Sequence, residues 1–390
     1  MSPEGRDDLR LARLELRGFR NLVDDTLEFP PEGVAVVGPN AQGKSNLLEA
    51  IHYLELLRSF RGVSDRDLVR FGEDVFRLEG RVVAEEVDAP FEGGLRDRSV
   101  AAAWQRTGSR KKVTLDGVEV DRLGDGVGHV GAVLFTPADL ALVDDGPHVR
   151  RRYLDIVLSL SEPGYLASLQ RYRQVLSQRN AALKAGGHPS QAGAWDGLLV
   201  DAGSRVTLLR SRWVQAMSGV LSLIHQEISG GTGARMTLES GIAGVEGGEL
   251  DEEGVREVFR TALAGSQERE ARLGTTTVGP HRDELLLLLE PGEGARDVRR
   301  FGSGGQRRSV ALSLRLLEAE TIRRRKGREP LLLMDDVFAE LDEARSIRLL
   351  ELLDRTAVGQ VILTAPRKAE IRFRDEGIER WGIREGKLLR

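Results

Sequence analysis

The residues with the clearest chemical meaning form a glycine-rich loop early in the chain. The sequence Gly-Pro-Asn-Ala-Gln-Gly-Lys-Ser occupies residues 38–45. Glycines at this spacing let backbone N–H groups wrap around phosphates, the lysine reaches the β- and γ-phosphates, and the serine hydroxyl binds Mg²⁺. We therefore predict an ATP or GTP site made by Gly38, Pro39, Asn40, Ala41, Gln42, Gly43, Lys44 and Ser45.

Two adjacent aspartates follow an apolar run much later in the chain. Residues 331–334 are Leu-Leu-Leu-Met, and Asp335 and Asp336 come directly after them. A carboxylate at the end of a buried strand needs a partner, and Mg²⁺ is the natural partner for Asp335. Asp336 would polarise the attacking water, so we expect it to act in catalysis together with Lys44. A helix-capping or ion-pairing role for Asp336 stays open.

A serine-glycine turn, Ser303-Gly304-Gly305-Gln306, precedes an amphipathic helix. Ser303 fits a helix N-cap, which is the simple structural interpretation. The same helix end could hold a γ-phosphate. A monomer seldom needs two anion-binding helix ends for one nucleotide, so we expect this one to serve the ATP of a second copy. Asp342 is placed to reach across such a dimer seam.

The elements around the loop follow from hydrophobic periodicity. Residues 33–37 form a continuous apolar strand that runs into the loop, and Leu47, Ile51 and Leu54 then recur at helical spacing. Residues 13–17 alternate as an edge strand does. Short strands are expected between residues 71 and 120, and another at 130–135. The order strand, loop, helix is the context that a phosphate-binding loop requires.

From Arg150 the hydrophobic period becomes helical. One stripe begins at Tyr165, and a longer one runs from Trp195 to Leu223, about 30 residues or roughly 45 Å if continuous. Gly203 and Gly219 are positions where it could bend. We expect a helical arm of two antiparallel helices, and a plain three-helix bundle remains an equal alternative. Residues 229–248 are glycine-rich and should break the helix, and residues 254–264 predict a short helix.

An α/β pattern returns in the last third of the chain. We expect strand character at Thr275 and a buried strand at 285–289, then helix 304–325, strand 331–334, helix 343–355 and strand 361–364. This order indicates a sheet that resumes after an insertion. The predicted domains are residues 1–148 and 275–390, which form the α/β head, and residues 149–274, the helical lobe.

Composition indicates a cytoplasmic protein with no membrane association. Hydrophobic residues make up 40% and charged residues 30%, no apolar run can cross a bilayer, and cysteine is absent. Residues 1–8 lack the apolar core of a signal peptide. The net charge of −4 argues against a simple polycation, yet basic residues cluster. We regard Arg58, Arg61, Arg150, Arg151 and Arg152 as possible nucleic-acid contacts, although such residues also close turns and line solvated helix faces.

The chain resembles the RecF family of recombination-repair ATPases, which is related to SMC proteins and ABC ATPases. The resemblance covers nearly the whole chain. Besides the phosphate loop, its motifs are Leu-Arg-Gly-Phe-Arg-Asn-Leu at 16–22, Asn-Leu-Leu-Glu-Ala-Ile at 46–51, Arg-Ser-Phe-Arg at 58–61, Phe-Thr-Pro-Ala-Asp-Leu at 135–140, Arg-Arg-Tyr-Leu-Asp at 151–155, Thr-Val-Gly-Pro-His-Arg-Asp at 277–283, and the segments 302–307 and 332–342.

The resemblance implies an ABC/SMC-type P-loop ATPase head (lobe I, mixed β-sheets with helices) interrupted by a mainly helical lobe II. Such proteins form ATP-dependent homodimers and bind double-stranded DNA and gapped or single-strand junctions. With RecR and RecO they help to load RecA, in DNA replication, recombination, repair and the SOS response to DNA damage. Ser303, Gly304, Gly305 and Gln306 would then contact ATP in trans.

Two departures from the wider ATPase pattern imply slow hydrolysis. Asp336 stands where a catalytic glutamate is usual, and Thr364 stands in place of the switch histidine. Two alternatives stay open, an ABC transporter motor and an SMC-like head with a structural role. The helical insertion of about 120 residues argues against both. A third class, an ATP-regulated nuclease, would need a cluster of acidic metal ligands beyond Asp335 and Asp336.

Overall fold

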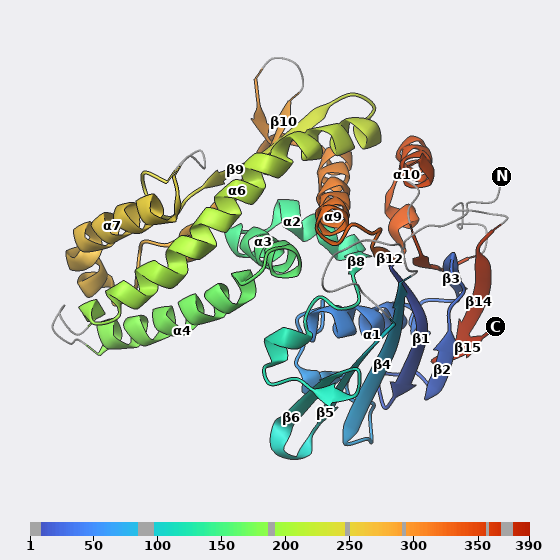
Figure 1. Cartoon of the computed structure of the whole chain (residues 1–390). Helices are drawn as coiled ribbons and strands as arrows, with labels where there is room; N and C mark the ends of the chain where they lie inside the picture. Colours follow the sequence, from blue (N-terminus) through green and yellow to red (C-terminus); the bar gives the residue numbers. More distant parts are fainter. Residues whose placement is uncertain are drawn as a thin grey trace. The chain divides into compact units, whose positions relative to one another are not determined.

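The structure is a computed structural model (Figure 1) that describes residues 9–84, 97–185, 192–245, 250–290, 294–355, 359–367 and 377–390. The charged segment 1–8 lies outside these residues. The chain divides into two compact units. The first combines Met1–Asp139 with Glu318–Arg390, and the second is Leu140–Leu317. The lobe boundaries expected after residues 148 and 274 stay a prediction.

The first unit contains a mostly parallel sheet with the strand order β15-β14-β3-β13-β12-β8. Its strands are β3 (Gly33–Val37), β8 (Ala132–Phe135), β12 (Leu331–Asp335), β13 (Val361–Ala365), β14 (Glu379–Arg384) and β15 (Lys387–Leu389). The strands β8, β12, β13 and β3 are parallel neighbours, and nearly all their residues are buried, as expected for continuous apolar runs. Their carboxyl ends therefore meet at one edge.

An antiparallel sheet of the same unit has the order β2-β1-β4-β5-β6-β7. It is built from β1 (Leu9–Arg17), β2 (Asp25–Glu28), β4 (Val75–Ala84), β5 (Arg98–Gln105), β6 (Arg110–Leu115) and β7 (Val118–Glu119). Helix α1 (Lys44–Leu56) contacts strands of both sheets, and one hydrophobic core joins the helix to them. Strands occur between residues 71 and 120 as expected, but β4 with ten residues and β5 with eight are longer than the short strands that the sequence predicted.

The second unit is mainly helical. It contains α2 (Ala141–Asp144), α3 (Pro147–Ser161), α4 (Tyr165–Lys184), α6 (Asp196–Ser229) and α7 (Glu252–Leu273). Helix α6 is continuous over 34 residues and is the long yellow-green helix of Figure 1. It packs against both α4 and α7, so the predicted pair of helices gains a third member. Neither Gly203 nor Gly219 interrupts α6.

A small sheet in the second unit corrects three expectations. Its order is β11-β10-β9, with β9 at Gly233–Glu239, β10 at Glu284–Glu290 and β11 at Arg296–Asp297. The glycine-rich segment after α6 thus contains a strand, because Met236 and its neighbours pair with β10. Residue 275 is not in a strand. Strand β10 alternates between buried and half-buried residues and belongs to this sheet, not to the resumed α/β sheet.

Three further helices complete the described fold. They are the short α8 (Val298–Phe301), α9 (Gly304–Lys326) and α10 (Glu343–Arg355). The predicted ranges for the last two, 304–325 and 343–355, agree with the structure. Within the described ranges, no helix combines the length and the apolar character that a membrane span requires.

Candidate nucleotide site

The phosphate-binding loop lies between β3 and α1, as its sequence predicts. Gly43 directly precedes α1 with φ of 112°, a left-handed conformation that favours glycine. Gly38 lies against strand β14, and a Cβ atom there would approach the carbonyl oxygen of Ile383 to 2.6 Å. Both glycines are therefore required by the backbone, one for its dihedral angles and one for close packing.

The Lys44 side chain is directed back over the loop. Its Nζ atom donates hydrogen bonds to the carbonyl oxygens of Gly38 at 2.8 Å and Pro39 at 3.3 Å, and the residue is 4% exposed. The ammonium group is held among main-chain groups of the phosphate-binding loop itself. This is where a lysine must lie if it is to reach phosphates that the loop encloses.

Ser45 and Asp335 are 290 positions apart in the chain and form a direct contact. The Ser45 hydroxyl donates a 2.9 Å hydrogen bond to Asp335 Oδ1. The contact forms because β3 and β12 end at the same sheet edge, with β13 between them. A hydroxyl and a carboxylate are the oxygen ligands that Mg²⁺ takes when phosphates supply the others. No cluster of three or more acidic or histidine ligands occurs in the described part of the chain.

Thr364 at the end of β13 holds both aspartates. Its hydroxyl donates to Asp335 Oδ1 at 2.8 Å and accepts the backbone N–H of Asp336 at 3.1 Å. Thr364 is buried at 3% exposure. The sequence identified Thr364 only as the replacement of a histidine, and its role as a shared hydrogen-bonding partner depends on β12 and β13 being neighbours.

Asp336 has an unusual backbone conformation. Its φ is 49°, in the left-handed region that aspartate tolerates better than most residues. It precedes the short turn Val337–Glu340, yet its side chain makes no capping hydrogen bond to that turn. The capping alternative left open by the sequence is thus not observed. Strain of this kind is typical of functional positions.

The C-terminal hairpin supports the loop from outside. The backbone N–H of Gly386 donates to the Gln42 carbonyl at 3.0 Å, and that of Glu385 donates to the Gln42 side chain at 2.7 Å. Gly386 has no room for a Cβ atom, which would lie 1.8 Å from the carbonyl oxygen of Asn21. The sequence gave no signal for this contact, because its partners come from opposite ends of the chain.

Comparisons with known proteins agree with this geometry. The model of the RecF/RecN/SMC N-terminal domain matches residues 10–380. A DNA replication and repair protein RecF from Synechococcus sp. (strain JA-3-3Ab) is 38% identical, over 88% of this chain and 88% of its own length. The RecF protein of Salinibacter ruber (strain DSM 13855 / M31) is 35% identical over 92% and 85% of the two chains. The chain belongs to the RecF family.

Solved structures confirm the predicted head fold. "The recombination mediator protein RecF-ATPrS in RecFOR pathway" is 30% identical, with a TM-score of 0.86 and coverage of 98% of both chains. The Smc head domain of Pyrococcus furiosus is 19% identical, with a TM-score of 0.56, and covers 98% of this chain and 95% of its own. The second likeness concerns the fold alone.

The RecF motif Arg-Ser-Phe-Arg at residues 58–61 surrounds a buried carboxylate in the first unit. Glu49 in α1 is fully buried and ion-paired with Arg20 at 3.0 Å and Arg61 at 3.2 Å, and Ser59 donates to it at 2.5 Å. Arg61 also donates to Asn46 at 2.7 Å, next to the phosphate-binding loop. Much of the Arg61 charge is thus engaged in these contacts. Arg58 is exposed.

The serine-glycine turn lies in the second unit and forms a capping box. The Ser303 hydroxyl accepts the N–H of Gln306 at 3.3 Å, and the Gln306 side chain accepts the N–H of Ser303 at 2.8 Å. The simple interpretation of Ser303 as an N-cap is therefore realised. Ser303 and Gly304 are also exposed, so the capped helix end is open to solvent.

Asp342 has a comparable role in the first unit. Its side chain accepts the N–H of Arg345 at 2.9 Å and caps α10, and this hydrogen bond lowers the pKa of Asp342. The side chain is 51% exposed. The other carboxylate oxygen is ion-paired with the Arg345 side chain, so a contact of Asp342 across a dimer seam stays a prediction.

The three arginines at the start of α3 differ in their surroundings. Arg150 is 5% exposed, ion-paired with Glu284 at 2.7 Å and bonded to the carbonyl of Asp145, so it cannot reach DNA without rearrangement. Arg151 donates to the carbonyl of Asp283. Arg152 is exposed and stays a candidate for DNA contact.

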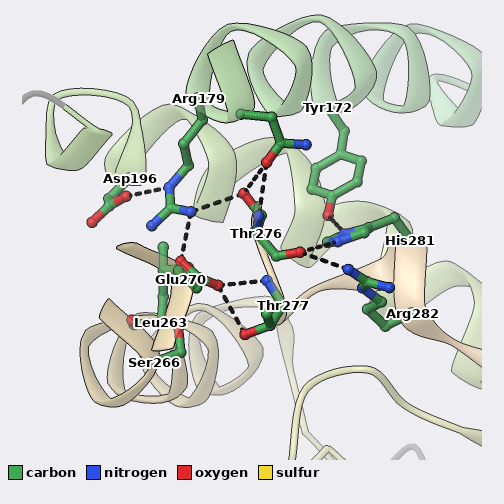
Figure 2. Close-up of polar contacts among 11 residues, drawn as sticks. Tyr172, Arg179, Asp196, Leu263, Ser266, Glu270, Thr276, Thr277, His281 and Arg282 are labelled. Atoms are coloured by element: carbon green, nitrogen blue, oxygen red, sulfur yellow. Dashed lines mark hydrogen bonds and ion pairs between the residues drawn. The ribbon is translucent and has the colours of Figure 1, made fainter. Parts of the chain in front are cut away.

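The RecF motif at residues 277–283 joins a buried polar network (Figure 2). Arg179 binds Glu270 and Thr276 at 2.7 and 2.8 Å, and Glu270 is fully buried. His281 is hydrogen-bonded to the Tyr172 hydroxyl at 2.6 Å and to the Thr276 carbonyl at 3.1 Å. Burial lowers the pKa of His281 to about 4, so at neutral pH it is an uncharged structural residue.

Proposed function

We propose that this chain is an ATP-dependent DNA-binding protein of recombinational repair, in which ATP acts as a dimerisation switch. The observation that carries the proposal is the Ser45–Asp335 contact at 2.9 Å beside the loop lysine, in a chain of the RecF family. RecF proteins named for DNA replication and repair, and RecF structures named for ATP and ATPrS, support it. They favour it over a transporter motor or a structural head.

Different residues of the site are proposed to bind the phosphates and the Mg²⁺ ion. Backbone N–H groups of the loop and Lys44 are suited to the phosphates, and the positive end of α1 adds to that field. Ser45 and Asp335 would hold Mg²⁺, which neutralises phosphate charge when bound. Thr364 fixes the direction of both aspartates through its bonds to Asp335 Oδ1 and the Asp336 N–H.

Hydrolysis is proposed to be slow. Asp336 is the proposed general base, which would accept a proton from the attacking water. An aspartate is shorter than the glutamate that is usual at this position, and Thr364 stands where a histidine would assist. A slow step suits a switch, because the dimer persists until its ATP is consumed.

The second half of the nucleotide enclosure is proposed to come from another copy. Ser303, Gly304, Gly305 and Gln306 form a capped helix end at which Ser303 and Gly304 are exposed, and Asp342 would meet the partner at the seam. The dimer would bind double-stranded DNA and gapped or single-strand junctions through Arg58, Arg61 and Arg152. RecR is the proposed direct protein partner, and RecO and RecA are proposed to act indirectly. The proposed location is the cytoplasm.

Sedimentation velocity with and without ATP and Mg²⁺ tests the switch. We expect the wild type to become a dimer only with ATP. Lys44→Ala should bind no ATP and stay monomeric, because the phosphate contacts are lost. Ser303→Arg should bind ATP with near-normal affinity and still stay monomeric, because its side chain fills the space of the partner's phosphate. Ser303→Ala is the matched control for the capping role of Ser303.

The outcomes are distinct. A wild type that stays monomeric with bound ATP overturns the switch. An Ser303→Arg variant that dimerises normally overturns the proposed contact in trans, while leaving the Ser45–Asp335 site intact.

A further inference from the structure

The antiparallel sheet of the first unit carries a basic hairpin that the proposed nucleotide switch does not use. Residues 105–112, which join β5 to β6, contain four basic residues and no acidic one. Two of them are engaged, Lys111 with Asp65 at 2.6 Å and Lys112 with Glu119 at 3.1 Å. The other two, Arg106 and Arg110, are exposed and form no ion pair with any described residue. We call these two residues the hairpin arginines.

An aromatic side chain lies in the neighbouring turn. Phe71 is fully exposed at 102%, an uncommon condition for a large apolar ring. It occupies a tight turn in which the Glu73 N–H donates to the Arg70 carbonyl at 3.0 Å and Gly72 has φ of 88°. The turn is therefore well defined, and Phe71 is held outward by its geometry.

The turn and the hairpin belong to one end of the sheet. The Arg106 N–H donates to the Asp74 carbonyl at 2.7 Å, and the next residue, Val75, pairs with Gln105. Nothing lies within 4 Å of where a Cβ atom would stand on Gly72 or Gly108, the glycines at the two tips. A ligand strand could thus approach both tips without displacing protein.

The charges around Phe71 favour a base over a phosphate at the ring. Glu73 and Asp74 are exposed in the same turn. The Glu73 carboxylate lies 3.9 Å from the Arg70 guanidinium, which is a long ion pair. These carboxylates disfavour a phosphate beside Phe71, whereas the hairpin arginines attract one nearby. An exposed aromatic ring next to unpaired arginines is the combination that binds single-stranded nucleic acid.

We propose that Phe71 stacks on an unpaired base and that the hairpin arginines hold the adjacent phosphates, so that this end of the sheet recognises single-stranded DNA. The proposal rests on the proposed DNA-binding function and deepens it by naming the residues that would recognise the unpaired strand of a gapped or single-strand junction. A base inside a duplex is covered by its neighbours, so Phe71 contributes only where a strand is unpaired or ends.

Binding of ATP-loaded protein to a duplex and to a gapped duplex of equal length tests the stacking. The gap carries 2-aminopurine, whose fluorescence falls when the base stacks on a ring. Phe71→Ala should weaken binding to the gapped DNA by about 5-fold to 150-fold, the value of one stacked base, and abolish the fluorescence change. Duplex affinity should be unchanged, and Phe71→Trp should restore both readouts. Val118→Ala, at another exposed apolar position, is the control.

The hairpin arginines are tested by salt dependence. Arg106→Ala with Arg110→Ala should reduce the slope of log affinity against log salt by about 1.4 on single-stranded DNA, since each lost phosphate contact changes it by about 0.7. Arg272→Ala is the matched control, because Arg272 near the end of α7 is exposed and forms no ion pair with the residues that the structure describes.

Three results would be decisive. Unchanged gapped-DNA affinity in both sets of variants overturns the proposal and leaves the hairpin as a surface for an acidic protein partner. Equal losses on duplex and gapped DNA overturn the stacking role. A wild type that binds neither DNA with ATP refutes the proposed function itself.

Discussion

Thr364 shows how one hydroxyl can organise two carboxylates. It contacts Asp335 Oδ1 and the Asp336 N–H, and Ser45 contacts the same Asp335 oxygen. Asp335 is 8% exposed, so its charge must be satisfied locally. The direction of both aspartates therefore depends on a residue that does not itself carry charge.

Replacing Thr364 with valine should separate positioning from nucleotide binding. Thr364→Val keeps the shape, but leaves a buried acceptor and the Asp336 N–H without this partner, at a cost of about 1 to 3 kcal/mol in the free energy of unfolding. We expect kcat for ATP hydrolysis to fall about 10-fold to 100-fold through misplacement of the aspartates, while ATP affinity changes little. Thr364→Ser should restore kcat. Equal losses of kcat and affinity would contradict a positioning role.

The buried position of His281 predicts that the protein loses stability in acid. Its pKa in the folded protein is about 4 because of burial, below the usual 6.5 of an unfolded chain. The unfolded state therefore binds more protons between these values. The stabilising contribution of neutral His281 is complete above pH 6.5 and declines as the pH falls toward 4.

The free energy of unfolding should fall by about 2 to 3 kcal/mol between pH 7 and pH 4.5 because of His281. Urea unfolding followed by circular dichroism at both pH values measures it. His281→Asn should lose that much less stability over the interval than the wild type does. Parallel pH profiles for the two proteins would show that His281 does not titrate as described.

At the scale of elements, helix α6 depends on glycine at one position and not at another. At Gly203 a Cβ atom would lie 2.6 Å from a Phe259 ring carbon in α7 and 2.9 Å from a Tyr172 ring carbon in α4. At Gly219 nothing lies within 4 Å of that point. Gly203 thus serves close packing of three helices, and the bend that its position suggested is absent.

This contrast gives a matched pair of variants. Gly203→Ala should destabilise the protein by about 1 to 3 kcal/mol through overpacking. Gly219→Ala should stabilise it by about 0.5 to 1 kcal/mol, because alanine suits a helix interior better than glycine. Urea denaturation monitored by helical circular dichroism distinguishes the two. Stabilisation by both substitutions would show that helix propensity, not packing, controls both sites.

At the scale of the whole molecule, the two ends of the chain complete one unit. Strand β3 lies between β13 and β14, which come from the last 30 residues. The phosphate-binding loop is hydrogen-bonded at Gln42 to Glu385 and Gly386. The chain must therefore leave the first unit, build the second and return. In the sequence, the division between the two units falls within α9, between Leu317 and Glu318.

DNA binding should depend on nucleotide if ATP controls assembly of the dimer. We expect tighter binding with ATP than with ADP, measured by fluorescence anisotropy. Affinity should fall about 100-fold between 50 and 200 mM salt if four phosphates are held. Ser303→Arg should bind DNA with ATP only as weakly as the wild type with ADP. Binding that ignored nucleotide would disconnect DNA recognition from the switch.

The sequence by itself determined the phosphate-binding loop between strand and helix, the long helix of the second unit, the helices at 304–325 and 343–355, and the strands at 331–334 and 361–364, but not β14 and β15. These follow from local patterns, namely glycine spacing, apolar runs and helical period, which act over a few residues. The same local logic failed at Gly233–Glu239, where glycines concealed a strand that exists because β10 pairs with it.

Only the tertiary structure decided which distant residues meet. Thr364 reaches both aspartates because β12 and β13 are neighbours, and Arg150 pairs with Glu284 across more than 130 positions. The turn that carries Phe71 lies beside Arg106 through the pairing of β4 with β5. Each contact depends on strand order and on long-range packing. Side-chain chemistry alone does not encode these, because the same residue types serve equally well in the core, at a helix cap or on the surface.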